Sequence, residues 1–310
     1  MSSHTRAILQ ALFVAFLWST SWVLIKIGLE DVKPLTFAGL RYGLAFMCLL
    51  PMALRKGGAG RFRHLDRADW RMLILLGLVF YTLTQGAQFV GLDYLPPVTL
   101  SLMLNFTSIV VALAGIPLLG EYPGRMQWGG IGLFVLGVLI YFYPVDIPSR
   151  EVFGLFVGAI GVLANAGSSI MGRSINRGAR LPAIVVTTVS MGVGSGALLV
   201  IGIFLEGFPA LDAQSWLIVI WLALVNTAFA FTLWNHTLRE LSAVESSVIN
   251  NTMLVQIAVL AWIFLDERIT LAEGAGLLLA ATGILTVQLF RSGQRMRPVV
   301  VDETAQEAGD

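Results

Sequence analysis

Side chains with hydrogen-bonding and stacking groups recur at helical spacing in this 310-residue sequence. The clearest set follows i, i+3, i+4 and i+7 spacing, which aligns its members along one face of a helix. These residues are Tyr81, Thr84, Gln85 and Gln88. Such groups can line a cavity and bind a ligand, or they can bond one packed helix to another. We favour the cavity because the set extends over two turns and includes an aromatic ring.

Similar polar residues occur in later apolar stretches, where a polar group must face protein or a watery cavity. We assign these residues to the same predicted ligand-binding cavity: Ser101, Asn105, Asn165, Ser169, Asn226, Trp234, Asn250 and Asn251. Asn105 and Asn251 could equally be structural pins between helices, and the sequence leaves both interpretations open.

Two tryptophans, Trp18 and Trp22, stand four residues apart with Ser19 and Ser21 between them. Paired indoles can stack on an aromatic or aliphatic ligand, or attract an ammonium group. Tight packing against the following helix is the alternative. We include both tryptophans among the candidate ligand-binding residues.

Arg41 and Glu245 are the charged candidates. Arg41 could hold a carboxylate in bidentate fashion, or it could be satisfied by backbone carbonyls, Glu30 or Asp31. Glu245 could relay protons or attract an amine. Lys26 is expected to reach the membrane interface as an anchor.

These residues belong to a chain that is 56% hydrophobic and only 13% charged, with a mean hydropathy of +0.80. Soluble domains carry about 25% charged residues, so the composition excludes a soluble enzyme and a disordered regulator. A helical span needs roughly 20 apolar residues. We predict an all-α integral membrane protein with ten transmembrane helices, at about 7–28, 34–54, 71–92, 97–119, 126–144, 152–172, 182–205, 215–236, 243–265 and 270–290.

The distribution of Lys and Arg supports this count. With the amino terminus in the cytoplasm, nearly all loop cations fall on the cytoplasmic side, and only Lys33, Arg150 and Arg268 fall on the other. We therefore expect a multi-pass protein of the inner (plasma) membrane with both termini cytoplasmic.

An internal repeat divides the ten spans into two sets of five. An ungapped shift of 146 residues aligns residues 70–139 with 216–285, pairing Asn105 with Asn251 and Glu121 with Glu267. Because five is odd, the second copy must enter the membrane inverted, as in many secondary transporters. We predict a first repeat at 1–145, an inverted second repeat at 146–292 and a disordered cytoplasmic tail at 293–310.

Residues 118–122 (LLGEY) and 264–268 (FLDER) form a motif that occurs once in each repeat, each copy before a glycine-rich span. Together with residues 18–22 (WSTSW) and 40–42 (LRY), this resembles the drug/metabolite transporter superfamily, specifically its ten-span EamA-type exporters. It is also similar to the branch that exports aromatic amino acids and paraquat. The resemblance implies an inner-membrane carrier whose two five-helix halves surround a central cavity.

The expected function is export of amino acids and related small metabolites by alternating access, in a cavity formed by spans one, three, four, six, eight and nine. Broad-specificity efflux of aromatic or cationic compounds is the alternative, and an intramembrane enzyme is a remote one. Since the chain lacks a phosphate-binding loop, hydrolase motifs and clustered metal ligands, we expect no enzyme activity, cofactor or metal. The expected partners are the small-molecule substrate and the lipid bilayer, with no nucleic acid, in a monomer or homodimer.

Overall fold

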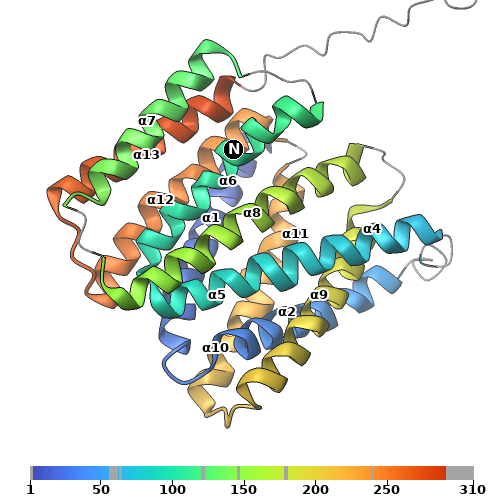
Figure 1. Cartoon of the computed structure of the whole chain (residues 1–310). Coiled ribbons are helices and arrows are strands. Elements are labelled where there is room, and N and C mark those ends of the chain that lie inside the picture. Colours follow the sequence, from blue (N-terminus) through green and yellow to red (C-terminus); the bar gives the residue numbers. More distant parts are fainter. Residues whose placement is uncertain are drawn as a thin grey trace, which may run out of the picture.

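The computed structural model describes residues 3–55, 62, 65–119, 123–144, 147–177, 181–238 and 240–290, and its regular structure over these ranges is helical (Figure 1). The helices in chain order are α1 (Ser3–Gly28), α2 (Pro34–Leu54), α4 (Arg67–Gly77), η1 (Leu78–Thr84), α5 (Gln85–Tyr94), α6 (Pro97–Leu119), α7 (Arg125–Tyr141), α8 (Ser149–Arg177), α9 (Ala183–Glu206), α10 (Ala213–Ala223), η2 (Leu224–Phe229), α11 (Ala230–Thr237), α12 (Ala243–Leu265) and α13 (Leu271–Leu289). The two η elements are π-helical turns.

The predicted all-α membrane fold is confirmed. Within the described ranges, nine helical stretches are long and apolar enough to cross a bilayer, and α7 is a shorter apolar helix between them. The third and eighth spans are each one continuous helical rod with a π-helical turn inside, α4–η1–α5 and α10–η2–α11. Span boundaries agree with the expected ones to within a few residues. The fifth span ends at Tyr141 and not at 144. Pro144 disfavours helical backbone at the residue before it, so the helix stops ahead of the proline.

Equivalent positions of the two repeats have the same local structure. Asp66 accepts a hydrogen bond from the backbone N–H of Asp69 and caps α4, and Asp212 accepts one from Ser215 and caps α10, each at 2.7 Å. The two capping residues stand 146 positions apart, and so do the first residues of the two π-helical turns. The repeat found in the sequence is therefore visible in helix starts and in backbone irregularities alike.

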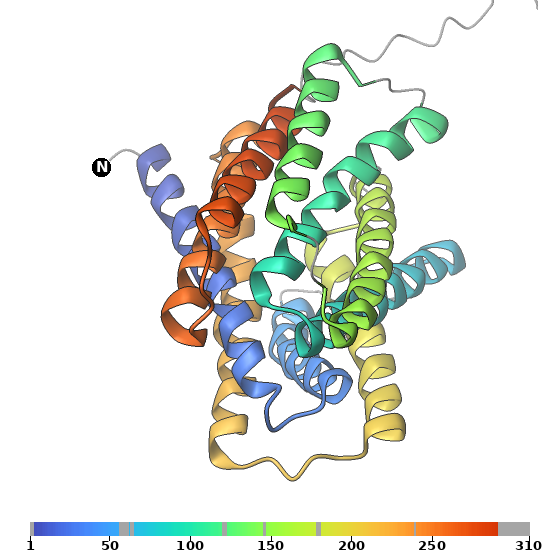
Figure 2. The ribbon, with the colours of Figure 1, turned by 60° about the vertical axis from the view of Figure 1, so that its left-hand side comes forward.

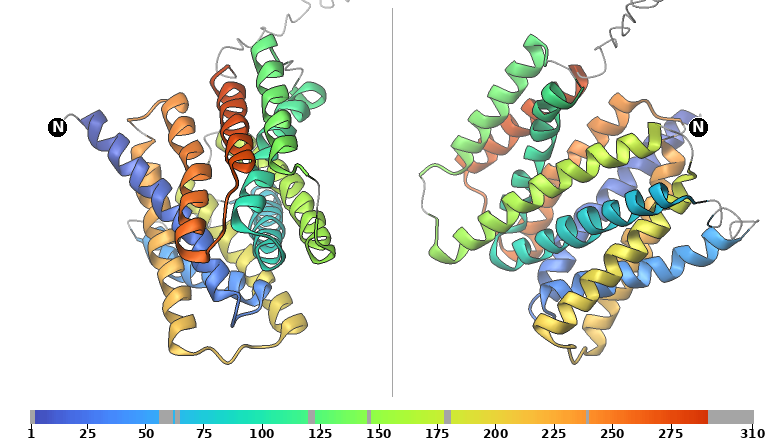
Figure 3. Two further views of the ribbon diagram at one scale, coloured as in Figure 1. Left: turned by 90° about the vertical axis from the view of Figure 1, so that its left-hand side faces the viewer. Right: turned by 45° about the vertical axis from the view of Figure 1, so that its right-hand side comes forward.

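Helices α7 and α13, the last of each repeat, lie side by side in every view (Figures 2 and 3). A β-carbon at Gly276 would lie 2.6 Å from the carbonyl oxygen of Gly137, and one at Gly130 would lie 2.8 Å from that of Gly283. The contact is reciprocal, because Gly276 is the repeat equivalent of Gly130 and Gly283 that of Gly137. A two-fold relation between the repeats produces this pattern of contacts.

Helices α2 and α9, the second of each repeat, form another direct pair between equivalent elements, and α6 also contacts its equivalent α12. The carboxylate of Glu206, at the end of α9, accepts hydrogen bonds from the backbone N–H groups of Leu35 and Thr36 at 3.1 and 2.9 Å. A carboxylate at a helix amino terminus is favourable because it satisfies free N–H groups and opposes the helix dipole. Glu206 thus fastens the two repeats together on this side, while α1 packs on α12 and α8 packs on α6 between the two pairs.

Candidate functional site

A cavity of about 120 Å³ lies between α1, α6 and α12, where helices from both repeats meet. Its lining is Trp22, Ser101, Leu104, Asn105, Asn250, Asn251, Met253, Leu254 and Ile257. Five of the residues selected from the sequence are in this set, drawn from three of the six spans expected to form the cavity. The lining contains carboxamides, one hydroxyl, one indole and aliphatic groups, and no charged side chain.

The two equivalent asparagines make the same local bond. The side-chain nitrogen of Asn105 donates to the carbonyl oxygen of Ser101 at 2.8 Å, and that of Asn251 donates to Ser247 at 3.0 Å, each four residues back. Asn251 also donates to Oε1 of Gln288 at 2.7 Å, which ties α12 to α13. Among the described residues no donor reaches either side-chain oxygen, so both oxygens can accept a hydrogen bond from a ligand.

Asn250 and Trp22 complete the polar and aromatic parts of the lining. Asn250 is exposed on α12, and among the described residues its side chain makes no hydrogen bond, so its amide has both donors and acceptor available. Trp22 is only 8% exposed, and its indole packs into the main hydrophobic core while one face borders the cavity. A ligand here would meet carboxamides from two helices and an indole from a third.

Trp18, four residues before Trp22, lies in different surroundings. Its indole N–H donates to the carbonyl oxygen of Asn226 at 3.1 Å, and its ring lies 5.2 Å from Trp234 and 5.4 Å from Phe231 between ring centres. Trp18 and Trp234 therefore hold α1 against η2 and α11. Trp18 is thus engaged in packing, but against the eighth span and not against the following helix, as the alternative had it.

Asn226 is fully buried where η2 meets α1. Its side-chain nitrogen donates to the carbonyl oxygen of Leu17 and to the hydroxyls of Thr20 and Ser21, the last two at 3.1 and 2.9 Å. Within the described residues its side-chain oxygen has no hydrogen-bond partner. Asn226 thus joins the eighth span to α1, outside the lining of the small cavity.

The predicted polar stripe of the third span is interrupted by η1, so α-helical spacing does not govern its four members. Tyr81 is 4% exposed and packs on the ring of Tyr42 at 5.5 Å, and Thr84 donates to the carbonyl oxygen of Val79 at 2.9 Å. Gln85 accepts from the Tyr42 hydroxyl at 2.7 Å, whereas Gln88 is half-buried in α5. The π-helical turn changes the spacing within the set, although Tyr81 and Gln85 still contact the same neighbour, Tyr42. None of the four lines the 120 Å³ cavity, and their part in a substrate path stays a prediction.

Arg41 is 95% buried, and the expected partners Glu30 and Asp31 are replaced by neutral groups. Its Nε donates to the hydroxyl of Thr227 in η2 at 3.2 Å, and its guanidinium lies 5.1 Å from the ring centre of Tyr42. A hydroxyl and an aromatic face partly compensate the lost hydration of a guanidinium. Arg41 therefore supports the π-helical turn of the eighth span and does not border the small cavity.

Asn165 and Ser169 of α8 also lie away from this cavity. The Asn165 side-chain nitrogen donates to the hydroxyl of Thr107 on α6 at 3.2 Å, an interhelical bond of the kind weighed as the alternative for such residues. Ser169 is exposed. The sixth span thus contributes packing on α6, and its polar residues are not part of the lining.

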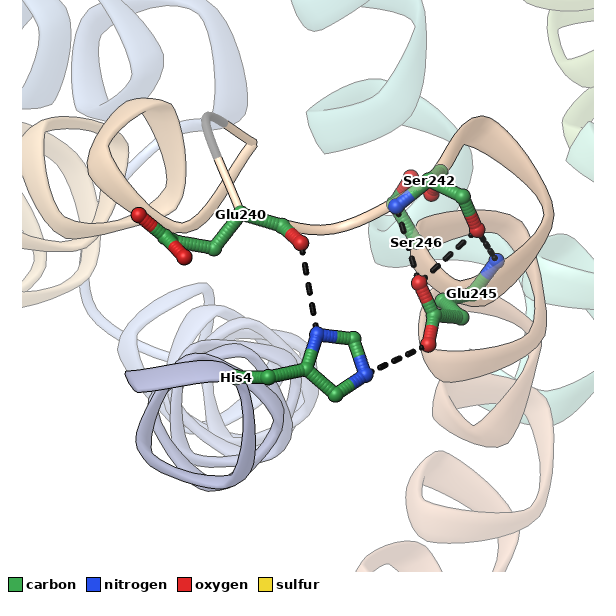
Figure 4. Close-up of polar contacts among 5 residues, drawn as sticks. All are labelled: His4, Glu240, Ser242, Glu245 and Ser246. Atoms are coloured by element: carbon green, nitrogen blue, oxygen red, sulfur yellow. Dashed lines mark hydrogen bonds and ion pairs between the residues drawn. The ribbon is translucent and has the colours of Figure 1, made fainter. Parts of the chain in front are cut away.

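Glu245 is a capping residue at the start of α12, and the predicted roles as proton relay and amine site find no support in its surroundings. It accepts from the backbone N–H of Ser242 at 2.9 Å, and its own N–H donates to the Ser242 hydroxyl at 3.2 Å, which is a capping box (Figure 4). Its other carboxylate oxygen lies 2.9 Å from Nε2 of His4. The Ser-x-x-Glu pattern at 242–245 is the sequence signal that could have identified this role.

Lys26 lies near the end of α1 and is half-buried against the end of α5. Its ammonium donates to the carbonyl oxygens of Leu92 and Leu95 at 2.6 and 3.1 Å, and so satisfies the end of α5. Lys26 and Glu267, in the connection between α12 and α13, line the same small pocket. Glu121, the repeat equivalent of Glu267, lies outside the described residues.

Burial raises the pKa of the Glu267 carboxyl to about 7, although the ammonium of Lys26 and a hydrogen bond from the backbone of Val98 both act to lower it. The carboxyl borders a larger cavity, of about 460 Å³, lined by the end of α7, the start of α13 and the start of α6. Glu267 stands in the repeated motif of residues 264–268, which by itself did not indicate a site at this carboxyl.

The sequence matches a known family of transporters over both repeats. The profile of the EamA-like transporter family matches the chain twice, over residues 5–143 and 152–289. The chain belongs to this family. It is thus a transporter of the drug/metabolite superfamily, with the repeated domain that the motif copies indicated.

Relatives match along nearly the full chain. An uncharacterized transporter of Bacillus subtilis, YvbV, is 29% identical over 310 residues, covering 97% of both chains. A probable amino-acid metabolite efflux pump of Escherichia coli is 25% identical, covering 94% of this chain and 96% of its own. An S-adenosylmethionine/S-adenosylhomocysteine transporter of Chlamydia trachomatis is 22% identical, covering 90% and 88%. A solved crystal structure shares the fold with a TM-score of 0.65 at 18% identity, over 92% of this chain and 98% of that one.

Proposed function

We propose that this EamA-type transporter exports amino acids and related small metabolites by alternating access, with the α1–α6–α12 cavity as its substrate site. The observation that carries the proposal is the composition of the cavity, whose lining unites an indole with carboxamides from both repeats. A site between two repeats is exposed in turn to either side when one repeat rocks against the other.

The substrate class follows from the groups available to bind it. The side-chain oxygens of Asn105 and Asn251 can accept from an ammonium group, the Asn250 amide can donate to a carboxylate, and Trp22 can pack on a side chain. An uncharged lining suits a zwitterion, which needs matched donors and acceptors and no net counter-charge. The relative named as an amino-acid metabolite efflux pump is in keeping with this class.

The proposed orientation places both termini in the cytoplasm and the chain in the inner membrane. The excess of Lys and Arg on one side supports it. Because each repeat, 1–145 and 146–292, has five spans, the second is then inverted relative to the first. The bonds of Asn105 and Asn251 to the carbonyl four residues back are then the same interaction in each of the two repeats. We propose export because a metabolite that is more concentrated in the cytoplasm moves outward, down its own gradient, as the transporter alternates between its two states.

Counterflow in proteoliposomes tests the function. Vesicles that contain the purified protein are loaded with unlabelled amino acid, and uptake of the same labelled compound is followed against empty vesicles. The panel covers aromatic, aliphatic and charged amino acids, cationic aromatic compounds, and S-adenosylmethionine, for which a relative is named as a transporter. We expect saturable counterflow for at least one zwitterionic amino acid. Folded protein that exchanges none of them, or exchanges only cationic aromatic compounds, would overturn the proposed substrate class.

A further inference from the structure

His4, in the first turn of α1, contacts two oxygens that can only accept hydrogen bonds (Figure 4). Its Nε2 lies 2.9 Å from a carboxylate oxygen of Glu245 in the first turn of α12, and its Nδ1 lies 3.3 Å from the carbonyl oxygen of Glu240 in the preceding connection. Neutral imidazole carries one N–H, whereas imidazolium carries two. Both contacts can therefore be hydrogen bonds only while His4 is protonated.

The protonated side chain of His4 is stabilised chiefly by the negative charge of the Glu245 carboxylate. The positive end of the α1 dipole opposes an imidazolium in the first turn of α1, whereas a carboxylate in the first turn of α12 is favoured. The other ionisable side chains on α1, α11, α12 and the connection between them are Arg6, Lys26, His236, Glu240 and, outside the described residues, Arg239. Lys26 lies at the far end of α1, where it bonds to α5. Figure 4 shows the Glu240 carboxylate directed away from the His4 ring, so the facing counter-charge is that of Glu245.

The corresponding positions at the opposite end of the bundle have neither a histidine nor an acidic residue. The 146-residue shift, extended from the aligned segment to α1 and α8, relates His4 to Arg150, Glu240 to Tyr94 and Glu245 to Thr99. The guanidinium of Arg150 lies 5.7 Å from the ring centre of Tyr94. A guanidinium keeps its charge at every physiological pH, whereas histidine ordinarily changes charge between about pH 5 and 8. Of these two contacts, then, only the one at the amino-terminal end can respond to pH.

The contact crosses from one repeat to the other and connects two helices of the cavity wall. Trp22 on α1 and Asn250 on α12 both line the cavity, about five and one helical turns beyond the contact. We propose that His4 and Glu245 form a pH-dependent latch, which holds α1 against α12 and closes the cavity at the amino-terminal end while His4 is protonated. The latch rests on the proposed function in one respect, since separation of α1 from α12 is taken as the opening step.

The expected size of the effect is modest. The side chains of His4 and Glu245 are 49% and 35% exposed, and ion pairs near water are weak. Breaking such a pair changes the ratio of closed to open molecules by up to about fivefold. A transporter whose two states are nearly balanced responds measurably to a shift of that size.

Electron–electron double resonance in lipid nanodiscs tests the latch without any substrate. Spin labels at Leu9→Cys on α1 and Val248→Cys on α12, both exposed positions, report the separation of the two helices once Cys48 is replaced by Ala. At about pH 6 we expect mainly the short label-to-label distance of the closed state. At about pH 8 we expect the ratio of molecules with the longer distance to those with the short one to rise by up to about fivefold. A distance distribution identical at both pH values would overturn the proposal.

Three variants separate the latch from general effects of pH. His4→Gln and Glu245→Gln should each give the open-shifted distribution at both pH values, and Gln at 245 still completes the capping box. His236→Gln removes a nearby exposed histidine and should keep the wild-type response. A pH response that survives in His4→Gln, or that is lost in His236→Gln, would contradict the latch. Since no transport is measured, a normal response in a protein that fails the counterflow assay would refute the function and leave the latch standing.

Discussion

At the scale of single residues, the site depends on which carboxamides are already engaged. Asn251 is bonded to Ser247 and Gln288, so its removal changes packing as well as the cavity. Asn250 makes no such bond within the described part of the chain, and it borders the same cavity. It is therefore the cleaner position for testing contact with substrate.

Asn250→Ala should raise the KM for counterflow by about ten- to a hundredfold, because a hydrogen bond to a charged carboxylate contributes about 1.5–3 kcal/mol. Folding should be unaffected, since the side chain has no bond to lose among the described residues. Ser169→Ala is the matched control, an exposed polar residue of α8 away from the cavity, and should keep the wild-type KM. Equal KM values for all three proteins would remove Asn250 from the substrate site.

Glu267 predicts a pH-dependent stability. Its pKa is raised to about 7 in the folded protein, above the ordinary value of 4.5, so the folded state holds the proton more tightly than the unfolded state. The contribution of Glu267 to the free energy of unfolding is therefore fully present below about pH 4.5 and is lost as the pH rises through about 7. Glu267→Gln cannot ionise and should raise the melting temperature relative to wild type at about pH 8, with little difference at about pH 4.5.

Glu273→Gln provides the control for that comparison. Glu273 forms a capping box with Thr270 at the start of α13, and Gln can replace it there. The thermal unfolding of detergent-solubilised protein gives the melting temperatures. If Glu267→Gln were more destabilising at high pH than at low pH, the Glu267–Lys26 attraction would outweigh burial and the account of this carboxyl would be wrong.

At the scale of elements, backbone contact between glycines holds α7 to α13. A β-carbon at Gly276 would lie 2.6 and 2.7 Å from the Gly137 carbonyl oxygen and the Tyr141 nitrogen, so the helices would have to separate. Gly276→Ala should destabilise the protein by about 1–3 kcal/mol, as overpacking does. Gly132→Ala, where nothing lies within 4 Å, should leave stability equal or higher, because Ala favours helix. Equal melting temperatures for the two variants would contradict this packing.

The helices themselves were predictable, whereas their irregular turns were not. Ten spans follow from apolar length because a bilayer sets the length of a helix that crosses it. The π-helical turns have no such signal: Thr84 and Thr227 each donate to a carbonyl five residues back, but threonine is common in ordinary membrane helices. The partner of Arg41 was equally hidden, since Thr227 is 186 residues away and chosen by tertiary packing. Glu245 was misjudged although its capping pattern was readable.

At the scale of the whole molecule, the two repeats meet in two kinds of interface. Equivalent helices pair directly, α7 with α13 and α2 with α9, and between them α1 packs on α12 and α6 on α8 (Figure 1). Close glycine contacts and the Glu206 cap make the direct pairs suited to act as fixed supports. The α1–α12 contact combines a surface ion pair at its end with a cluster of small side chains, Ala7, Ala11 and Ala15, packed on Leu241 and Ile249. It borders the cavity, and under the proposed latch it is the interface that opens.

The central claim is that this cavity is exposed in turn to the two sides of the membrane. Leu104→Cys in the Cys48→Ala background places one thiol in the cavity wall. Sealed vesicles of either orientation are treated with a membrane-impermeant thiol reagent, with and without the amino acid identified by counterflow. The account predicts modification from both sides, each slowed by substrate. Modification from one side alone, or from both at rates that substrate leaves unchanged, would contradict it.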